Sequence, residues 1–299
     1  MNKFLIIYNP ISGVKSNKNM IKKLEQRLIA LNKDYKTIAT EYKGHAESIC
    51  GQQEILKYDS IIICGGDGTF NEAVNGLMKN HKPNDIPKVG FLPGGTGNAF
   101  MHDLNLTNPD NAIDTIIANN CKKIDILKLE HENSIGYSMN IVGWGMVTDI
   151  LILAEKMRFF GSVRYTLASL FYIFFQRKRT LDISVNNKGF SKKSYIFILI
   201  TNTIHTGKGM RAAPDALLDD GKFDVVFLKS NISKLKLLML FPQLFSGDHI
   251  QSKYVKYIQA KNIELKPDFN EVLNIDGEVK EKTPVKISIM PKSLFIYRN

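Results

Sequence analysis

Two short segments combine glycine, hydroxyl and carboxyl groups at a spacing that suits phosphate chemistry. Residues 64–72 read CGGDGTFNE and residues 92–100 read LPGGTGNAF. Each follows an apolar run that is typical of a buried strand, at 60–63 and at 88–91. Glycines at such a turn permit positive φ angles and let a phosphate approach the backbone, and the N–H groups that begin a following helix bind anions. The two segments therefore favour a site for nucleotide phosphates.

A third segment of this kind comes earlier in the chain, where the apolar run at 4–8 leads into NPISG at 9–13. Any one of the three turns alone is also typical of an ordinary connection between a strand and a helix. Open α/β sheets bind ligands at the carboxyl ends of their parallel strands. Three such turns along one sheet edge therefore favour a nucleotide site over three ordinary connections.

Asp67, inside the first segment, indicates more closely which reaction this site supports. A carboxylate beside phosphates is repelled unless Mg²⁺ lies between them or the carboxylate takes a proton from a hydroxyl that is about to be phosphorylated. The residue types therefore indicate phosphoryl transfer, with Asp67 either near the metal or acting as a base.

Strand and helix patterns alternate over the first 120 residues. Strands are expected at 3–8 and 35–40, and helices from 17, at 45–57 and at 109–119. This alternation predicts an α/β domain with a mainly parallel sheet that is covered on both faces.

From residue 123 the pattern changes to strands joined by turns, which predicts a β-rich second domain. Helices are expected within it at 148–176 and 231–246. The expected strands are 124–129, 135–142, 181–185, 195–201, 223–228, 263–266 and 285–289.

Together the motifs resemble the catalytic domain of the diacylglycerol kinase and sphingosine kinase family of lipid kinases, which includes soluble bacterial members. The likeness covers nearly the whole chain, in the family's order. NAD kinases are similar and also carry GGDGT, but there the Asn-Glu pair lies in a later motif, whereas here Asn71 and Glu72 follow directly. The matching segments are 9–13, 65–72, 93–98, 143–145, 213–221 and 274–278.

This resemblance implies a two-domain architecture with a cleft. The first domain, 1–122, is expected to have the parallel sheet of NAD kinases and to bind the nucleotide. The second, 123–290, is expected to be a β-rich sandwich that binds lipid, and the segment at about 291–299 is expected to return to the first domain.

The resemblance also implies an ATP site made of the three turns and a threonine after the second strand. The residues carried over are Asn9, Pro10, Ser12, Gly13, Thr40, Gly65, Gly66, Asp67, Gly68, Thr69, Asn71, Glu72, Gly95, Thr96 and Asn98.

Two acidic segments of the second domain acquire roles through the same resemblance, although an Asp-Gly pair alone is also typical of a plain turn. Asp220, with the backbone carbonyls of Leu217 and Lys222, is implied to hold Mg²⁺. Glu278 is implied to be the general base for the lipid hydroxyl, in preference to Asp67, and Asp276 belongs to a network linked to Mg²⁺.

The lipid headgroup is expected to contact Asp149. Residues 143–165 look closest to sphingosine and ceramide kinases, but sphingosine kinases use a second acid two residues after the position of Asp149, where this chain has Leu151. Because a cationic amine needs an anionic partner, a neutral lipid such as diacylglycerol or ceramide is expected to be preferred to sphingosine.

Composition fits a lipid kinase of the cytoplasm that associates peripherally with membranes. The 299 residues carry a net charge of +11, and the three cysteines at 50, 64 and 121 indicate a reducing compartment. An anionic leaflet attracts each nearby Lys or Arg by about 1 kcal/mol. The aromatic run at 171–175 followed by basic residues at 177–179 suits membrane contact, although a core helix with a charged end is the alternative.

No nucleic-acid-binding motif accompanies this charge, so no nucleic acid is expected as a partner, and a homodimer is compatible with the sequence. Two rival functions stay open: a soluble-metabolite kinase of the NAD kinase type, and a module that binds lipid or nucleotide without catalysis.

Overall fold

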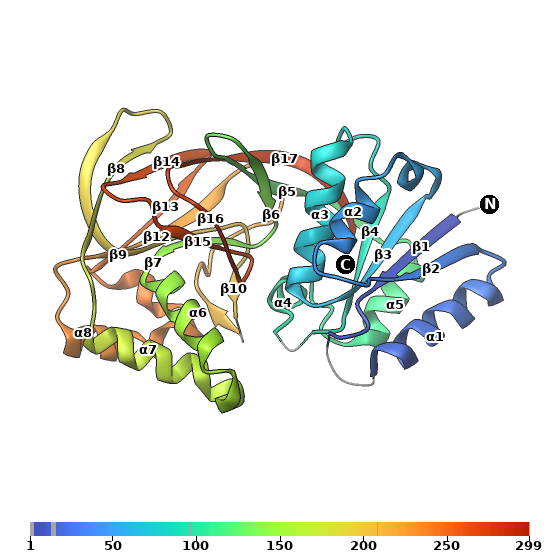
Figure 1. The fold of residues 1–299 in the computed structure, drawn as a ribbon, viewed down its shortest axis with the longest axis horizontal. Helices are drawn as coiled ribbons and strands as arrows, with labels where there is room; N and C mark the ends of the chain where they lie inside the picture. Colours follow the sequence, from blue (N-terminus) through green and yellow to red (C-terminus); the bar gives the residue numbers. More distant parts are fainter. Residues whose placement is uncertain (1–2, 13–15, 96, 208, 299) are drawn as a thin grey trace. The chain divides into compact units, whose positions relative to one another are not determined.

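The computed structural model describes residues 3–12, 16–95, 97–207 and 209–298 (Figure 1). Gly13 and Thr96, two of the predicted ATP contacts, lie outside the described residues. The chain forms two compact units, Met1–Ile126 with Met290–Asn299, and Leu127–Ile289. The sequence placed the first boundary at 122/123. Two long strands, β5 (Cys121–Glu130) and β17 (Val285–Tyr297), contribute residues to both units.

The first unit contains a parallel sheet in the strand order β17-β4-β3-β1-β2. Ile296 of β17 pairs in parallel with Val89. Strand β3 is buried along its whole length, as expected for a central parallel strand with helices on both faces. The remaining strands are β1 (Lys3–Tyr8), β2 (Asp34–Ala39), β3 (Ser60–Gly65) and β4 (Lys88–Pro93).

Helices cover both faces of this sheet, because right-handed crossovers that run in opposite directions along a sheet place their helices on opposite faces. Neighbouring residues of β4 show the two faces. A Cβ at Gly90 would lie 3.2 Å from Ile116, whereas the ring of Phe91 lies 4.7 Å from that of Phe70. The helices are α1 (Ser16–Ala30) and α5 (Pro109–Ile117) on one face, α2 (His45–Cys50) and α3 (Asp67–Asn80) on the other, and the short α4 (Ala99–Asp103).

The second unit is a sandwich of two sheets joined by β9 (Ser191–Thr201). The first residues of β9 pair with β8, and the later ones pair with β7 and β12. A core that includes Trp144, Ile198, Phe223 and Leu265 fills the space between the sheets. The other strands are β6 (Ile135–Ser138), β7 (Ile141–Gly145), β8 (Arg179–Val185), β10 (His205–Thr206), β11 (Met210–Arg211), β12 (Phe223–Lys229), β13 (Val255–Ala260), β14 (Asn262–Pro267), β15 (Val272–Ile275) and β16 (Glu278–Lys282).

Helices of the second unit pack on the outer face of β9 and β12, so these two strands are buried on both sides. Ile173 and Leu237 of the helices meet Leu199 and Val226 of the strands in a second core. No helix in the described part of the chain is long and apolar enough to cross a membrane. These helical elements are α6 (Met146–Lys156), η2 (Arg158–Val163), α7 (Arg164–Phe174), α8 (Lys234–Leu240), α9 (Gln243–Ser246) and η3 (Asp248–Gln251).

Three predicted helices are wrong in length, because glycine or proline interrupts them. The helix expected at 45–57 ends before Gly51 and is followed by a separate 3-10 turn, η1 (Gln53–Lys57). The helix expected at 148–176 is broken at Gly161, which has a φ of 60°. The helix expected at 231–246 divides at Pro242.

Candidate active site

The predicted phosphate-binding segments begin where the parallel strands of the first unit end. Asn9 follows β1, Thr40 follows β2, Gly66 follows β3 and Gly94 follows β4. Because β1 to β4 run in parallel, these four segments share one edge of the sheet. This is the edge at which open α/β sheets bind ligands.

Glycine is required in the two central turns because their backbones touch. A Cβ on Gly95 would lie 2.6 Å from the Cα of Gly66, and a Cβ on Gly94 would lie 3.1 Å from the nitrogen of Gly65. Glycine permits positive φ angles, but Gly65, Gly66 and Gly95 do not adopt them. The close approach of two backbones, and not a left-handed conformation, therefore explains these glycines.

Asn9 connects the first turn to the segment after β3. Its Oδ1 accepts hydrogen bonds from the backbone N–H groups of Ile11 (3.0 Å) and Ser12 (3.3 Å). Its Nδ2 donates to Oγ1 of the buried Thr69 at 3.3 Å. The Ser12 hydroxyl in turn donates to the Asn9 carbonyl at 3.0 Å. These bonds fix the shape of the turn that the sequence predicted to contact phosphate.

Two further asparagines organise the turn after β4. Asn98 has a φ of 47°, accepts from the N–H of Gly95 at 3.1 Å and donates to the Gly95 carbonyl at 2.9 Å. Asn17, a buried residue that the sequence did not single out, donates to the carbonyls of Ser12 and of Gly94, the latter at 3.3 Å. Asn17 therefore joins the turns after β1 and β4.

Asp67 is the first residue of α3, and its carboxylate also reaches the start of α4. Oδ2 accepts the N–H of Ala99 at 3.1 Å, and Oδ1 accepts the N–H of Phe100 at 3.4 Å. The carboxylate thus receives hydrogen bonds from the first two residues of α4, a contact that the sequence did not predict. If the Asp67 carboxylate were removed, these two N–H groups would lose this acceptor.

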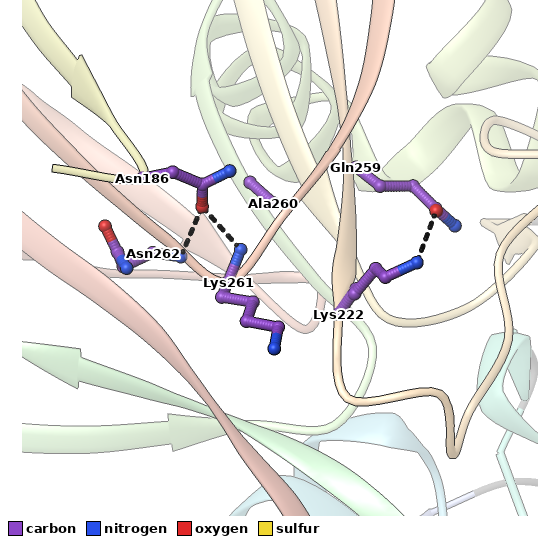
Figure 2. A pocket seen from close by; sticks show the side chains of 6 residues that line it. All are labelled: Asn186, Lys222, Gln259, Ala260, Lys261 and Asn262. Atoms are coloured by element: carbon purple, nitrogen blue, oxygen red, sulfur yellow. Dashed lines mark hydrogen bonds between the residues drawn. The ribbon is translucent and has the colours of Figure 1, made fainter. Parts of the chain in front are cut away.

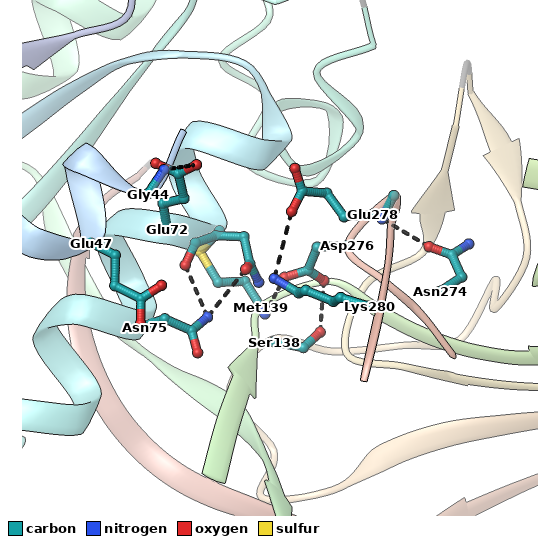
Figure 3. Close-up of polar contacts among 12 residues, drawn as sticks. Gly44, Glu47, Glu72, Asn75, Ser138, Met139, Asn274, Asp276, Glu278 and Lys280 are labelled. Atoms are coloured by element: carbon teal, nitrogen blue, oxygen red, sulfur yellow. Dashed lines mark hydrogen bonds and ion pairs between the residues drawn. The ribbon is translucent and has the colours of Figure 1, made fainter. Parts of the chain in front are cut away.

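Glu72 and Asn71 support the other side of this edge. Oε1 of Glu72 accepts the N–H of Gly44 at 2.8 Å (Figure 3). Thr40 is buried and donates its N–H to the carbonyl of Tyr8 at 2.8 Å. The buried Asn71 accepts two hydrogen bonds from Nδ2 of Asn75. Glu72 therefore holds the loop that follows Thr40, and Asn71 is fixed within α3.

In the second unit, Asp276 and Gly277 form the tight turn between β15 and β16. Their φ angles of 50° and 87° suit a two-residue hairpin loop, for which Asp-Gly is a preferred sequence. Ile275 pairs with Glu278 across the turn, and the N–H of Gly277 donates to Oδ1 of Asn274 at 3.0 Å. The turn thus brings two acids together at one end of the hairpin.

The Asp276 carboxylate is buried and accepts hydrogen bonds from four consecutive residues. Oδ1 accepts from the Ser138 hydroxyl (2.6 Å), the Asn140 N–H (3.0 Å) and the Ile141 N–H (2.9 Å). Oδ2 accepts from the Met139 N–H at 3.1 Å (Figure 3). Asp276 therefore anchors the connection between β6 and β7 to the β15–β16 turn.

Glu278 has a different environment from Asp276. Its carboxylate lies 3.8 Å from Nζ of Lys280, and 26% of its side chain is exposed (Figure 3). A partly exposed carboxylate at the end of a rigid hairpin can accept a proton from a bound hydroxyl.

Asp149, the predicted lipid contact on α6, is held by Arg179 of β8. Nη2 of Arg179 lies 3.0 Å from Oδ1 and 2.7 Å from Oδ2 of Asp149, and Nε lies 2.8 Å from Oε1 of Glu271. Burial alone would lower the pKa of Arg179, but the bonds with Glu271 and Asp149 outweigh it and raise that pKa.

The predicted metal segment contains several carboxylates. Oδ1 of Asp220 accepts the N–H of Lys222 at 2.9 Å, and the side chain of Leu217 is exposed. Burial raises the pKa of Asp224 to about 6, and the nearby carboxylates of Asp220 and Asp215 act in the same direction. Oδ1 of Asp224 is buried without a hydrogen-bond partner among the described residues.

This arrangement fits a divalent cation, because a cation offsets clustered negative charge. Among the residues that the structure describes, no group of three or more His, Cys, Asp or Glu side chains could hold a metal. A cation at Asp220 would therefore depend on backbone carbonyls and water as well, which is ordinary for Mg²⁺.

A pocket of about 350 Å³ lies elsewhere in the second unit, near the turn between β13 and β14 (Figure 2). In it, Oδ1 of Asn186 accepts the N–H of Lys261 at 2.9 Å, and Nζ of Lys222 donates to Gln259 at 3.2 Å. Lys222 is the one predicted site residue in its lining. The lining residues are Asn186, Lys222, Gln259, Ala260, Lys261 and Asn262.

Comparison with known proteins identifies the family. Residues 3–129 match the model of the diacylglycerol kinase catalytic domain, and residues 140–298 match that of the YegS C-terminal NAD kinase beta sandwich-like domain. The chain belongs to the diacylglycerol kinase family of lipid kinases. The resemblance predicted from the motifs is therefore confirmed.

Relatives in this family include differently named lipid kinases. The chain is 30% identical over 283 residues to a diacylglycerol kinase of Bacillus subtilis, covering 93% of this chain and 90% of that one. It is 32% identical over 300 residues to a diacylglycerol kinase of Staphylococcus aureus, with coverage of 98% and 91%. It is 26% identical over 349 residues to sphingosine kinase 2 of Arabidopsis thaliana, with coverage of 99% and 72%.

Solved structures confirm the fold of this family member. A crystal structure of a diacylglycerol kinase from Bacillus anthracis superposes with a TM-score of 0.76 at 24% identity, covering 100% of this chain and 97% of that one. An NAD kinase from Archaeoglobus fulgidus, solved with ATP, gives a TM-score of 0.55 at 11% identity, with coverage of 99% and 94%. The predicted combination of an NAD-kinase-like α/β domain and a β-rich domain is confirmed.

Three residues with structural roles in this family member are not indicated by the sequence. Asn17 and Ser138 lie outside the glycine and acidic motifs. Arg179 belongs to the basic run at 177–179, whose charge indicated only a possible membrane contact. Asp149, the partner of Arg179, lies 30 residues away in the sequence, and Asp276, the partner of Ser138, lies 138 residues away. No local pattern could have indicated these contacts.

Proposed function

We propose that this protein is an ATP- and Mg²⁺-dependent kinase that transfers the γ-phosphate of ATP to a hydroxyl group of a membrane lipid. The observation that carries the proposal is the shared sheet edge of the first unit, where four predicted phosphate-binding segments begin at the ends of parallel strands. Membership of a lipid kinase family supports the same reaction.

ATP binds at this edge through backbone N–H groups of the two glycine turns and through the hydroxyl groups of Thr40 and Thr69. Backbone donors at the start of a helix favour the negative charge of phosphate. The contact between Gly66 and Gly95 keeps these turns close to each other. Positioning and charge stabilisation of this kind supply most of the rate enhancement in phosphoryl transfer.

Glu278 acts as the general base. It accepts the proton of the lipid hydroxyl while the hydroxyl oxygen bonds to the γ-phosphorus, and the bond from that phosphorus to the β–γ bridging oxygen breaks to leave ADP. Asp276 positions Glu278 by anchoring the hairpin turn, since its carboxylate accepts four hydrogen bonds. Asp67 holds the start of α4, beside the glycine turns.

Asp220, together with the carbonyl groups of Leu217 and Lys222, would hold Mg²⁺ in the second unit. The nearby carboxylates of Asp215 and Asp224 support this assignment. When bound, Mg²⁺ supplies positive charge that offsets clustered carboxylates and phosphates.

The membrane is reached through the outer face of α7. Ala168 and Ile173 are buried against the unit, whereas Phe171, Phe174 and Phe175 are exposed. The basic residues at 177–178 follow directly. An aromatic face with an adjacent basic end suits an anionic bilayer surface.

Labelled ATP tests this function. The protein is incubated with γ-labelled ATP and Mg²⁺, first with mixed micelles that contain diacylglycerol, ceramide or sphingosine and then with NAD. Label in the organic phase is expected. Label on NAD would establish a soluble-metabolite kinase instead, and label on none of these acceptors would favour a binding module.

A further inference from the structure

The ion pair around Arg179 is unusual among the charged groups of the second unit because its guanidinium is buried. Only 9% of the Arg179 side chain is exposed, against 61% for Lys192 in its pair with Asp268. Arg179 contacts two acids from other elements, Asp149 on α6 and Glu271 just before β15. Buried ion pairs of this kind are strongly coupled, since removal of one partner leaves an uncompensated charge.

Both oxygens of Asp149 are committed to the same guanidinium nitrogen, at 3.0 and 2.7 Å. The positive charge of Arg179 therefore cancels the charge of Asp149, the carboxylate expected to meet the lipid headgroup. Glu271 uses only Oε1 in its bond with Arg179, so the remaining negative charge of the cluster resides on Glu271. Asp149 by itself offers little attraction to an ammonium group.

One donor of Arg179 is unused. Nη1 is buried and has no hydrogen-bond acceptor among the described residues. A buried donor without an acceptor is costly. An ester carbonyl or hydroxyl oxygen of a lipid could accept this hydrogen bond, whereas an ammonium group could not, because it has no lone pair. The unused donor and the neutralised acid thus favour the same ligand chemistry.

We propose that Arg179 determines headgroup selectivity: it neutralises Asp149 and presents Nη1 to an oxygen of the substrate, so that the lipid accepted is an uncharged glycerolipid or ceramide and not a sphingoid base with a free amine. This inference rests on the lipid kinase function proposed above and adds to it the substrate class and a positioning residue. Leu151, two residues after Asp149 on α6, supplies no second acid.

The test is the ratio of kcat/KM for diacylglycerol to kcat/KM for sphingosine in the same mixed micelles. In Arg179→Gln the Asp149 carboxylate loses its counter-charge, so the ratio is expected to fall at least tenfold. In Asp149→Asn the guanidinium loses one of its two acidic partners and repels an ammonium more strongly, so the ratio is expected to rise at least tenfold. The double variant, which has neither charge, is expected to return to within threefold of the wild-type ratio.

Glu271→Gln is the matched control, because it removes a charge from the cluster but leaves the pair of Arg179 with Asp149. Its ratio is expected to stay within threefold of wild type. A ratio that changes as much in Glu271→Gln as in Arg179→Gln would overturn the proposal, as would an unchanged ratio in a folded Arg179→Gln protein. Arg179→Lys, which keeps the charge, is expected to recover most of the wild-type ratio.

Thermal unfolding of each variant shows whether it folds. If Arg179→Gln does not fold, the Asp149→Asn variant tests the proposal instead. An unchanged ratio of kcat/KM values in Asp149→Asn would contradict the proposal. A wild-type protein that prefers sphingosine would overturn this inference while leaving the lipid kinase function intact. A wild-type protein that phosphorylates no lipid would instead overturn the proposed function.

Discussion

The phosphate edge of the first unit and the acidic clusters of the second unit are built in different ways. At the phosphate edge, the critical contacts are between backbones, as where Gly66 meets Gly95. In the second unit, the critical contacts are made by carboxylates, as where Asp276 accepts four hydrogen bonds and Asp149 pairs with Arg179. The residues that the first region tolerates are therefore limited by space, and those that the second tolerates are limited by charge and hydrogen bonding.

This difference decides how each region responds to substitution. An added methyl group at the phosphate edge displaces a backbone, with little effect expected on the remainder of the fold. Loss of a carboxylate in the second unit leaves buried donors or a buried charge without a partner, which costs stability. Variants in the first region should thus lose function first, and variants in the second should lose stability as well.

Asp276→Ala should have the largest effect on stability. It removes the acceptor of the Ser138 hydroxyl and of three backbone N–H groups in a buried position. Each unsatisfied buried donor costs about 1–3 kcal/mol. The free energy of unfolding should fall by about 4 kcal/mol, as measured by urea denaturation, or the second unit should fail to fold.

Asp268→Ala is the control for that prediction. Asp268 pairs with Lys192 at the surface of the same unit, and exposed pairs contribute little to stability. Its unfolding curve should match that of wild type. If both variants are equally stable, the hydrogen bonds of Asp276 have no structural importance.

Asp67→Ala should lower activity strongly while leaving the fold intact. The change removes the acceptor at the start of α4 and with it the position of the turn that precedes α4. Misplacement of a binding group by about 1 Å can cost 10²-fold in rate. The kcat for lipid phosphorylation should thus fall at least that far, with little change in the far-ultraviolet circular dichroism spectrum.

Asp59 offers a comparison for Asp67, because it lies just before β3 at the opposite end of the strand, where it accepts the N–H of Lys3 at 2.7 Å. Asp59→Ala should retain the kcat of wild type. Near wild-type activity in Asp67→Ala would contradict the assignment of this edge as the ATP site.

Glu72→Gln should have the smallest effect. The amide oxygen of glutamine can still accept the N–H of Gly44, but more weakly than a carboxylate. The KM for ATP should rise a few-fold, since a charged hydrogen bond contributes about 1 kcal/mol more than a neutral one. Glu47→Gln, which breaks only a surface pair with Lys79, should leave KM unchanged; an equal rise in both variants would refute a role for Glu72.

The same contrast explains what the sequence could predict. The turns after β1, β3 and β4 consist of neighbouring residues, so local patterns indicated both the strands and a phosphate site. The pattern did not indicate that these glycines are needed for close packing of two backbones, without positive φ angles. The pattern also predicted continuous helices through Gly51 and Gly161, because the apolar spacing continues past both interruptions.

The second unit was less predictable because its contacts join residues that are distant in sequence. The sequence predicts Asp149 as a lipid contact, but its ion pair with Arg179 depends on the tertiary structure that brings one end of β8 to α6. The hydrogen bonds of Asp276 depend on the pairing of β7 with β15, which brings the connection between β6 and β7 to the turn at Asp276. Such contacts follow from tertiary structure, which composition and periodicity do not determine.

The central claim is that backbone groups of the first unit bind ATP and that a carboxylate of the second unit, Glu278, accepts the proton of the lipid. The direct measurement is kcat for lipid phosphorylation by Glu278→Gln, together with its Kd for ATP from titration calorimetry. Loss of a general base should lower kcat by about 10²–10⁴-fold, with the Kd for ATP unchanged. A kcat within threefold of wild type would contradict this division of roles.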